Sequence, residues 1–530
     1  MPTALIIGSG PGAAGTALAL TADPAHEVTV IDLGGTLEAD LSLARSKIAS
    51  IEEASWSPSD VGRINQQPSP VEIGAIPQKQ AFGSDFPFRD VGQLDGIEAV
   101  GPTNPSVVSG AYGGFSNVWG AQIMPFSRAT FDRWPLTLED MESHYRSALS
   151  EMTLAGAEDD LSEVFPLMVE AGQLPPLADR SERVLDRYQA RRAFVRSHAI
   201  TVGRARLAFR SGDCTCCGLC MTGCPYQLIY SSSHTFDRLR SEGRIAYRPN
   251  LLATRLEERD GSPSVRVQDT NTGARQRFSA DRIFVACGGI GTARLVLGSL
   301  GKFDRTTRVQ ESVQFVMPTI SLRPVPDPRQ ERNFTLNQFN LLYDHTGEAV
   351  DLCQIHFYDY NPAFLSSLPS FLSGRRAEPV LAGLLRRISV GLGYIPSWGS
   401  PEVRLTTRRP RDDEQLPTLE IDREQIEGWP PMLRGLVRSM SKVAPALDLW
   451  PVVPMISVSA AAKSYHFGGT FPHGRVRSEQ TTDVLGRLAA WDNIHLVDGS
   501  VFPTVPATTF TLTVMANAHR IASGVLEMPR

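Results

Sequence analysis

The sequence lacks any run of the roughly 20 apolar residues that a membrane-spanning helix needs, and it opens without a basic and then apolar leader segment. It also lacks an excess of one charge, because 52 Lys and Arg residues stand against 57 Asp and Glu residues, for a net charge of −5. Nucleic-acid binding needs a basic face, which this balance does not supply. We therefore expect a cytoplasmic protein with a small-molecule partner, no nucleic-acid partner and no membrane span.

Cysteine is scarce, with seven in 530 residues, which is too few for a disulfide scaffold. Five of the seven nevertheless fall in a cysteine-rich loop at residues 214–225. Apart from Cys216, their spacing is the C-x2-C-x2-C-x3-C-P run of bacterial ferredoxins. The spacing predicts an iron–sulfur cluster held by Cys214, Cys217 and Cys220, with Cys224 as the candidate fourth ligand. A zinc site, a disulfide within the loop and inert packing thiols remain alternatives.

Residues 4–32 predict a strand, a glycine turn, a helix and a second strand, the order of a dinucleotide-binding unit. Gly8, Gly10 and Ala13 occupy the small positions of the turn, where the backbone must approach a pyrophosphate at a helix N-terminus. Asp32 ends the second strand and is expected to accept hydrogen bonds from ribose hydroxyls. The motif itself does not choose between NAD and FAD.

A second strand, glycine turn and helix start are predicted at residues 281–295, returning to the same nucleotide site. Residues 251–257, 264–269 and 277–280 precede it and predict a small antiparallel meander. The dinucleotide domain is therefore expected to be discontinuous.

Three C-terminal segments bear on the cofactor and the family. They are residues 464–474, which contain His466-Phe467-Gly468-Gly469-Thr470, residues 493–504, which contain Asp498-Gly499-Ser500-Val501-Phe502-Pro503-Thr504, and residues 511–518. Their order and spacing resemble the glucose-methanol-choline (GMC) family of FAD oxidoreductases. The resemblance extends to residues 113–121, which look like the loop over the flavin, and to residues 134–145.

The resemblance implies an α/β fold: a Rossmann-like FAD-binding domain and a substrate-binding domain with a mostly antiparallel sheet, as in the GMC and p-hydroxybenzoate-hydroxylase-like architecture. The expected FAD-binding domain comprises residues 1–130, 200–300 and 451–530, and the substrate-binding domain residues 131–199 and 301–450. FAD is expected to be non-covalent, because Val118 stands where some relatives carry a flavin-linked histidine. The expected FAD-binding residues are Gly8, Gly10, Pro11, Gly12, Ala13, Asp32, Gly114, Ser116, Asn117, Leu252, Gly288, Asp498, Gly499 and Thr511.

The resemblance also implies a reaction. His466 occupies the place of the base that takes the proton of a substrate hydroxyl, while the hydride of the carbon passes to FAD. Thr509 stands where the family carries a second catalytic Asn or His, and its hydroxyl cannot act as a base near pH 7. His473 stands at a usual Met position and is interpreted as a packing residue.

The leading hypothesis is oxidation of a CH-OH group on a sugar, aminosugar or polyol-like metabolite. Electrons would leave to O2 or to an external acceptor, and a cluster would favour the acceptor. The alternatives are non-alcohol chemistry on the same fold, such as dehydration or decarboxylation, for which Thr509 is the motive, and an electron-transfer protein that relays electrons through FAD and an iron–sulfur cluster.

The middle of the chain lacks cofactor motifs and predicts strands at residues 314–322, 335–343 and 353–360. His356, Tyr358 and Tyr360 alternate on one strand face and either line the substrate pocket or are ordinary sheet residues. Residues 379–394 are expected to form a helix, either a plain lid or domain helix or an amphipathic helix for a membrane surface or a partner. Residues 55–80 predict an irregular surface excursion.

Overall fold

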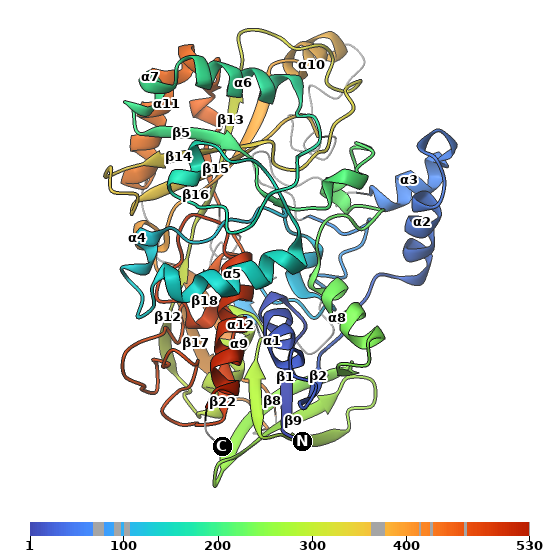
Figure 1. The fold of residues 1–530 in the computed structure, drawn as a ribbon, viewed down its shortest axis with the longest axis vertical. Coiled ribbons are helices and arrows are strands. Elements are labelled where there is room, and N and C mark those ends of the chain that lie inside the picture. The colour runs from blue at the N-terminus through green and yellow to red at the C-terminus, as the bar shows by residue number, and fades with distance from the viewer. Residues whose placement is uncertain are drawn as a thin grey trace.

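The computed structural model describes residues 1–66, 79–89, 97–99, 107–361, 377–412, 415–423, 428–459 and 464–528. Figure 1 shows a parallel sheet with its helices in the lower half and a larger antiparallel sheet in the upper half. Both chain ends lie at the bottom of this view. The chain crosses between the two halves several times, so segments distant in sequence meet between them.

The lower half is built on a five-stranded parallel sheet with the order β22-β11-β1-β2-β7. The strand bounds are Ile494–Leu496 for β22, Arg282–Val285 for β11, Thr3–Ile7 for β1, Glu27–Ile31 for β2 and Ala246–Arg248 for β7. β1 and β11 pair in parallel, as expected for a strand that returns to the same nucleotide site. The predicted α/β fold class is confirmed.

Helix α1 (Pro11–Thr21) follows the glycine turn and packs against α12 (Thr511–Leu526), which also contacts α5 (Leu138–Met152). Glycine is required at this contact, because a Cβ on Gly15 would lie 2.1 Å from the carbonyl oxygen of Met515. The first and last helical segments of the chain are thus held together at backbone distance, beside the glycine turn.

Two further sheets accompany the parallel sheet. The predicted meander is a three-stranded sheet of β8 (Leu251–Arg259), β9 (Ser262–Asp269) and β10 (Arg275–Ser279). A mixed five-stranded sheet has the order β21-β12-β17-β18-β3, with bounds Phe467–Gly468, Arg305–Glu311, Val403–Arg408, Thr418–Arg423 and Ile97–Ala99. β21 directly follows His466, so this sheet anchors the predicted base.

The upper half contains a seven-stranded antiparallel sheet with the order β19-β13-β16-β15-β14-β5, in which β20 also pairs with β13. The bounds are Trp450–Pro451, Gln314–Ile320, Ile388–Tyr394, Leu352–Tyr358, Phe339–Asp344 and Ile200–Arg204, with Ser457–Val458 for β20. The strand predicted from residue 335 begins only at Phe339. Helix α11 (Pro431–Leu447) lies beside α6 (Asp179–Ala190) and α7 (Arg192–Arg196), on the side of this sheet that Ile355 and Phe357 face.

The helix predicted over residues 379–394 is only half correct. Helix α10 covers Glu378–Leu385, and the remainder is strand β16, inserted between β13 and β15. Gly393 makes this insertion possible, because a Cβ there would lie 2.0 Å from the ring of Phe315 on β13. Strand pairing overrides the apparent helical pattern, as tertiary context commonly does.

The remaining elements connect these sheets. They are α2 (Ala39–Ala49), α3 (Pro58–Ile64), α4 (Arg128–Phe131), α8 (Ser232–Ser241), α9 (Gly289–Ser299) and the strand pair β4 (Leu154–Ala155) and β6 (Leu207–Ala208). Helix α3 falls within residues 55–80, which the composition predicted to be irregular. Residues 67–78 of that segment lie outside the described residues.

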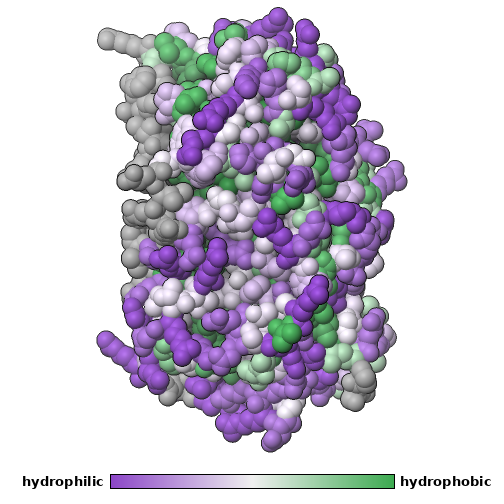
Figure 2. Space-filling view, turned by 90° about the vertical axis from the view of Figure 1, so that its left-hand side faces the viewer, coloured by the Kyte–Doolittle hydropathy of each residue, from purple (hydrophilic) through white to green (hydrophobic). Residues whose placement is uncertain are grey.

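The face seen in Figure 2 is predominantly hydrophilic, with small apolar areas scattered between polar ones. Among the described residues, no helix is long and apolar enough to cross a bilayer.

Candidate active site

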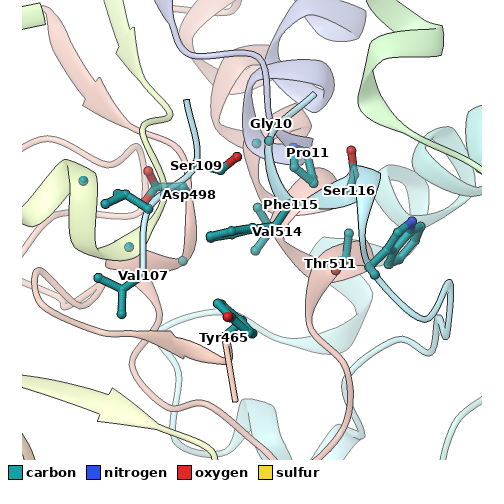
Figure 3. Close-up of a pocket in the computed structure, with 18 of the residues that line it drawn as sticks. Gly10, Pro11, Val107, Ser109, Phe115, Ser116, Tyr465, Asp498, Thr511 and Val514 are labelled. Carbon is teal, nitrogen blue, oxygen red and sulfur yellow. The ribbon is translucent and has the colours of Figure 1, made fainter. Parts of the chain in front are cut away.

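One cavity of about 420 Å³ joins the glycine turn of the lower half to one face of the seven-stranded sheet. Figure 3 shows Gly10, Pro11, Ser116 and Thr511 around it, with Tyr465 approaching from another side. The predicted site residues that line it are Gly8, Gly10, Pro11, Gly12, Asp32, Gly114, Ser116, Leu252, Gly288, His466, Asp498, Gly499, Thr509 and Thr511. Ala13 is buried inside α1, and Asn117 is not among the lining residues.

The glycine turn leaves room for a ligand against its backbone. Gly8 adopts φ +105°, and a Cβ there would lie 2.5 Å from the carbonyl oxygen of Ala286 on the neighbouring chain segment. A Cβ on Gly10, in contrast, would meet no protein atom within 4 Å. Gly10 is the N-cap of α1 and supplies no side-chain cap. The open N-terminus of α1 therefore presents backbone N-H groups to the cavity, as a pyrophosphate site requires.

Asp32 is buried at the end of β2 and is oriented by two hydroxyl donors. The Ser9 hydroxyl donates to its carboxylate at 2.5 Å and the Tyr247 hydroxyl at 3.1 Å. Burial raises the pKa of Asp32 to about 6, although both hydrogen bonds oppose the rise. The carboxylate is thus charged above about pH 6 and faces the cavity where a ribose is expected.

Asp498 lies at the cavity wall beside the start of α1, since a Cβ on Gly12 would lie 3.5 Å from its Cα. The Ser500 backbone N-H donates to its carboxylate at 2.9 Å, and the hydroxyl of Thr292 on α9 also donates to it. Burial raises the pKa of Asp498. These bonds hold Gly499 and the start of α9, near Gly288, at the cavity wall.

The loop at residues 113–118 is held over α1 by its own hydrogen bonds. The N-H of Gly113, which adopts φ +91°, donates to the Ser9 hydroxyl at 2.9 Å. The Asn117 amide donates to the carbonyl oxygens of Tyr112 at 2.9 Å and Gly114 at 2.8 Å. Asn117 therefore shapes the loop, while Gly114 and Ser116 face the cavity.

His466 reaches the cavity from the residues that precede β21. Its backbone carbonyl accepts from the Ser312 N-H at 2.9 Å, and its own N-H donates to the Ser464 hydroxyl at 3.1 Å. The preceding Tyr465 adopts φ +57°, a strained value for a residue with a side chain, of a kind that clusters at functional sites.

The His466 imidazole is enclosed by aromatic rings. It stacks on Tyr394 and meets the edge of Phe510, with ring centroids 4.5 Å and 5.0 Å away. Its Nδ1 is buried with no hydrogen-bond partner among the described residues. Burial lowers the pKa of His466 to about 3, so the imidazole is neutral near pH 7.

Thr509 lies in the same cavity, but its hydroxyl already has a partner. It donates to the backbone carbonyl oxygen of Gln122 at 2.8 Å. The Gln122 side-chain amide nitrogen, in contrast, is buried and has no partner in the described part of the chain. Thr509 keeps only acceptor capacity toward a ligand.

His473 lies away from the cavity. Its Nδ1 donates to the Asp483 carbonyl oxygen at 2.7 Å, and its Nε2 accepts from the Asn517 amide at 3.2 Å. Both nitrogens of a neutral imidazole are thereby satisfied in the core, which supports the interpretation of His473 as a packing residue.

The four predicted cluster ligands are not gathered into a ligand set. All seven cysteines lie within the described residues and are free, which removes the disulfide alternative. Within the described ranges, no group of three or more metal-ligating side chains is placed to hold an ion. The described fold therefore gives no support to an iron–sulfur cluster.

Several cavity residues escaped the sequence analysis. Lys79 lines the cavity, donates to the Trp119 carbonyl oxygen at 2.8 Å, and has its pKa lowered to about 8 by burial. Tyr394 lies in the segment predicted to be helical, and Gln122 lies in no motif.

Of the three residues predicted either to line the pocket or to be ordinary sheet residues, His356 and Tyr358 line the cavity and Tyr360 does not. The alternation of polar residues along β15 is the sequence signal that indicated these two.

The chain is similar to several known proteins. The GMC oxidoreductase family profile matches residues 439–518. The 6'''-hydroxyparomomycin C oxidase of Streptomyces lividus is 25% identical over 420 residues, which cover 74% of this chain and 72% of the relative. An uncharacterized GMC-type oxidoreductase of Sinorhizobium fredii is 32% identical over 74 residues, or 14% of this chain and 15% of the relative.

Among solved structures, pyridoxine 4-oxidase from Mesorbium loti covers 100% of this chain and is itself covered over 100% of its length. The two share a TM-score of 0.59 at 14% sequence identity, which shows a common fold. These matches confirm the resemblance drawn from the C-terminal motifs.

Proposed function

We propose that this chain, whose residues 439–518 match the GMC oxidoreductase family, is a member of that family and uses non-covalent FAD to oxidise a CH-OH group of a small molecule to a carbonyl. The observation that carries the proposal is the shared cavity, in which a dinucleotide cradle and a neutral histidine face the same space.

The residues present fit FAD. The N-terminus of α1, with Gly10 and Gly12, suits the pyrophosphate, and Asp32 suits the ribose hydroxyls. Gly288 and Gly499 keep side chains out of the cavity wall near Asp498, and the loop carrying Gly114 and Ser116 covers the cavity. When bound, FAD supplies the hydride acceptor for the reaction.

The chain's own residues handle the proton. His466 is neutral near pH 7 and faces the cavity, so it takes the hydroxyl proton of the substrate as the carbonyl forms. Tyr394 and Phe510 keep water from the imidazole and hold its orientation. Thr509 orients the substrate by accepting a hydrogen bond, because its own proton is committed to the Gln122 carbonyl oxygen.

The cavity also weighs between the alternatives. A protein that only relays electrons needs no polar groups reserved for a substrate, so the unpartnered histidine and glutamine nitrogens among the cavity-lining residues favour an enzyme with a substrate. The motive for dehydration or decarboxylation is that Thr509, at the position of a second catalytic residue, cannot act as a base. His466 supplies that base without Thr509, which favours alcohol oxidation.

The substrate class is proposed to be a sugar, an aminosugar or a polyol-like metabolite. The relative from Streptomyces lividus is named for the oxidation of 6'''-hydroxyparomomycin C, and it covers most of this chain. The panel for the test therefore comprises 6'''-hydroxyparomomycin C, glucose, glucosamine, sorbitol and pyridoxine.

Anaerobic bleaching of the flavin absorbance tests the proposal. At least one panel compound should bleach wild-type protein, and His466→Ala should retain FAD while bleaching roughly 100-fold more slowly or worse. A yellow protein that no hydroxyl compound bleaches, or a His466→Ala variant as fast as wild type, would contradict the proposal.

The electron exit is tested separately. Because the cysteines are not assembled as ligands in the described structure, no step is routed through them, and reoxidation by O2 or an external acceptor is proposed. We expect anaerobically purified protein to contain FAD without stoichiometric iron. Iron and acid-labile sulfide at several atoms per FAD, lost in Cys217→Ser, would restore the cluster and its electron route.

A further inference from the structure

A second histidine faces the cavity from the seven-stranded sheet. In β15 the side chains of Gln354, His356 and Tyr358 share one face, because successive side chains of a strand alternate. The register pairs His356 with Leu392, and Gln354 with Tyr394, on β16. Leu392 and Tyr394 line the cavity together with His356 and Tyr358, so this sheet face forms its wall opposite the glycine turns.

The His356 imidazole carries an unsatisfied nitrogen. The residue is 3% exposed, and its Nε2 is buried without a hydrogen-bond partner in the described residues. Leaving a buried polar group unpaired costs about 1–3 kcal/mol, so such an atom calls for an explanation. His473 shows the ordinary solution for a core histidine, with both nitrogens bonded.

His495 is the informative comparison, because its Nε2 is also buried and unpartnered. Its ring stacks on Phe284, its Nδ1 donates to the Leu485 carbonyl oxygen at 2.8 Å, and it does not line the cavity. His356 differs in that its unpaired nitrogen belongs to a side chain at the cavity wall. A ligand in the cavity is therefore available to satisfy it.

His356 and His466 are positioned by one aromatic ring. Tyr394 lies 4.5 Å from the His466 ring and 5.4 Å from the His356 ring, measured between centroids. The Tyr394 hydroxyl accepts from the Gln314 amide at 2.9 Å, which fixes the ring in place. Burial, and to a lesser extent the charge of a protonated His466, lower the pKa of His356 to about 3. Near pH 7 both imidazoles are neutral, and the pair accepts one proton rather than two.

We propose that His356 is a second catalytic residue, whose imidazole N-H donates a hydrogen bond to the reacting oxygen of the substrate. This inference rests on the proposed function. In the reaction the O-H bond breaks and its proton passes to His466, while the C-H bond breaks and its hydride passes to FAD, which is reduced as the alcohol is oxidised. His356 keeps its proton throughout and stabilises the negative charge that develops on the oxygen.

Two histidines are needed because one imidazole cannot both accept the substrate proton and donate a hydrogen bond to the same oxygen. A neutral imidazole offers one acceptor and one donor on opposite sides of its ring, so His466 cannot both accept the proton and donate to the same oxygen. The Thr509 hydroxyl proton is committed elsewhere. A separate neutral donor at the cavity wall is therefore needed, and His356 is placed to provide it.

The test compares His356→Leu, which removes the donor, with His356→Gln, which restores an N-H donor of similar reach. Tyr360→Phe is the control, because Tyr360 lies two residues beyond the end of β15 and outside the cavity lining. The measurements are FAD content, melting temperature and the rate of anaerobic flavin bleaching by whichever of glucose, glucosamine and 6'''-hydroxyparomomycin C bleaches wild type fastest.

His356→Leu should keep its FAD and bleach about 100-fold more slowly, since loss of one such donor costs roughly 100- to 1,000-fold. The Michaelis constant should change much less than the limiting rate, and His356→Gln should recover at least about tenfold over His356→Leu. A signal independent of turnover comes from ¹⁵N-histidine spectra of FAD-loaded protein, in which the same compound should shift the His356 imidazole resonances.

His356→Leu bleaching within threefold of wild type would overturn the inference, as would equal loss of rate in the Leu and Gln variants. If the Leu variant does not fold, unshifted His356 resonances on addition of the compound overturn it. These outcomes are distinct from failure of the proposed function, in which wild-type protein itself is bleached by none of the three compounds.

Discussion

Tyr394 and His466 stack with their ring planes 19° from parallel and their centroids 4.5 Å apart, although 71 intervening positions separate them in the chain. The contact joins the seven-stranded sheet to the segment that precedes β21. It therefore couples the orientation of the proposed base to the sheet that we propose as the substrate wall.

This contact predicts different outcomes for two substitutions of Tyr394. Tyr394→Phe keeps the ring and loses only the hydrogen bond from Gln314, so bleaching should fall no more than about threefold. Tyr394→Ala removes the ring that orients both histidines, and the rate should fall by at least about 30-fold with FAD retained. Equal rates in the two variants would show that the stacking does not orient His466.

Gly10 and Gly12 are predicted to fail in different ways when replaced by alanine. A Cβ on Gly10 meets no protein atom within 4 Å, so Gly10→Ala should fold normally and lose FAD affinity because its methyl group occupies the cradle. A Cβ on Gly12 would lie 2.5 Å from the carbonyl oxygen of Val497, so Gly12→Ala should lower the melting temperature even without FAD.

Thermal melts of FAD-free protein, combined with FAD titration by fluorescence quenching, separate the two effects. An FAD-free Gly10→Ala protein that melts several degrees below wild type would contradict the assignment of Gly10 to the cofactor alone.

FAD binding should weaken in acid through Asp32. Its pKa is raised from the usual 3.8 to about 6, so the carboxylate that accepts ribose hydroxyls is lost as the pH falls through about 6. Asp32→Asn should bind FAD about tenfold more weakly at pH 8 and show little further loss at pH 5. Dissociation constants at the two pH values, measured for both proteins, check this.

The raised pKa of Asp32 also affects the free energy of unfolding of the FAD-free protein, but with the opposite pH dependence. A carboxyl whose folded pKa is raised stabilises the fold below about pH 3.8 and loses that contribution as the pH rises through about 6. The prediction for FAD affinity has its own contradicting outcome. If the FAD dissociation constants of wild type and Asp32→Asn change in parallel with pH, Asp32 does not bind the ribose as proposed.

His473 should make the fold sensitive to acid. Burial lowers its pKa to about 3, whereas the unfolded chain protonates this imidazole near 6.5, so stability is present above about pH 6.5 and is lost as the pH falls toward 3. The loss is at most about 1.4 kcal/mol per pH unit for this one proton. His473→Gln should show a shallower fall in melting temperature between pH 7 and 5. Identical slopes in the two proteins would contradict this.

Local patterns predicted the nucleotide half well. The glycine turn after β1, the helix α1, Asp32 at the end of β2 and the returning strand β11 are all encoded within short stretches, because each depends on backbone sterics and on hydrophobic periodicity. The same holds for the meander of β8 to β10, whose turns are marked by Gly261 and Gly273.

Prediction failed where distant segments decide local structure. Residues 388–394 read as part of a helix, yet they form a central strand because β13 and β15 pair on both sides and Gly393 admits the Phe315 ring. The spacing of Cys214, Cys217 and Cys220 matched a cluster motif, but the described fold does not gather their side chains into a ligand set. Spacing alone does not specify the direction of side chains in an irregular loop.

The sequence by itself determined the likeness to the GMC oxidoreductases and led to the proposals of FAD as cofactor and His466 as base, since His466 and the glycine turn lie within contiguous motifs. Only the tertiary structure decided which other groups meet His466. Tyr394, His356 and Gln122 come from separate strands and loops, and their convergence depends on strand register and sheet packing, which are non-local. The second histidine of the cavity therefore emerges from the fold rather than from any motif.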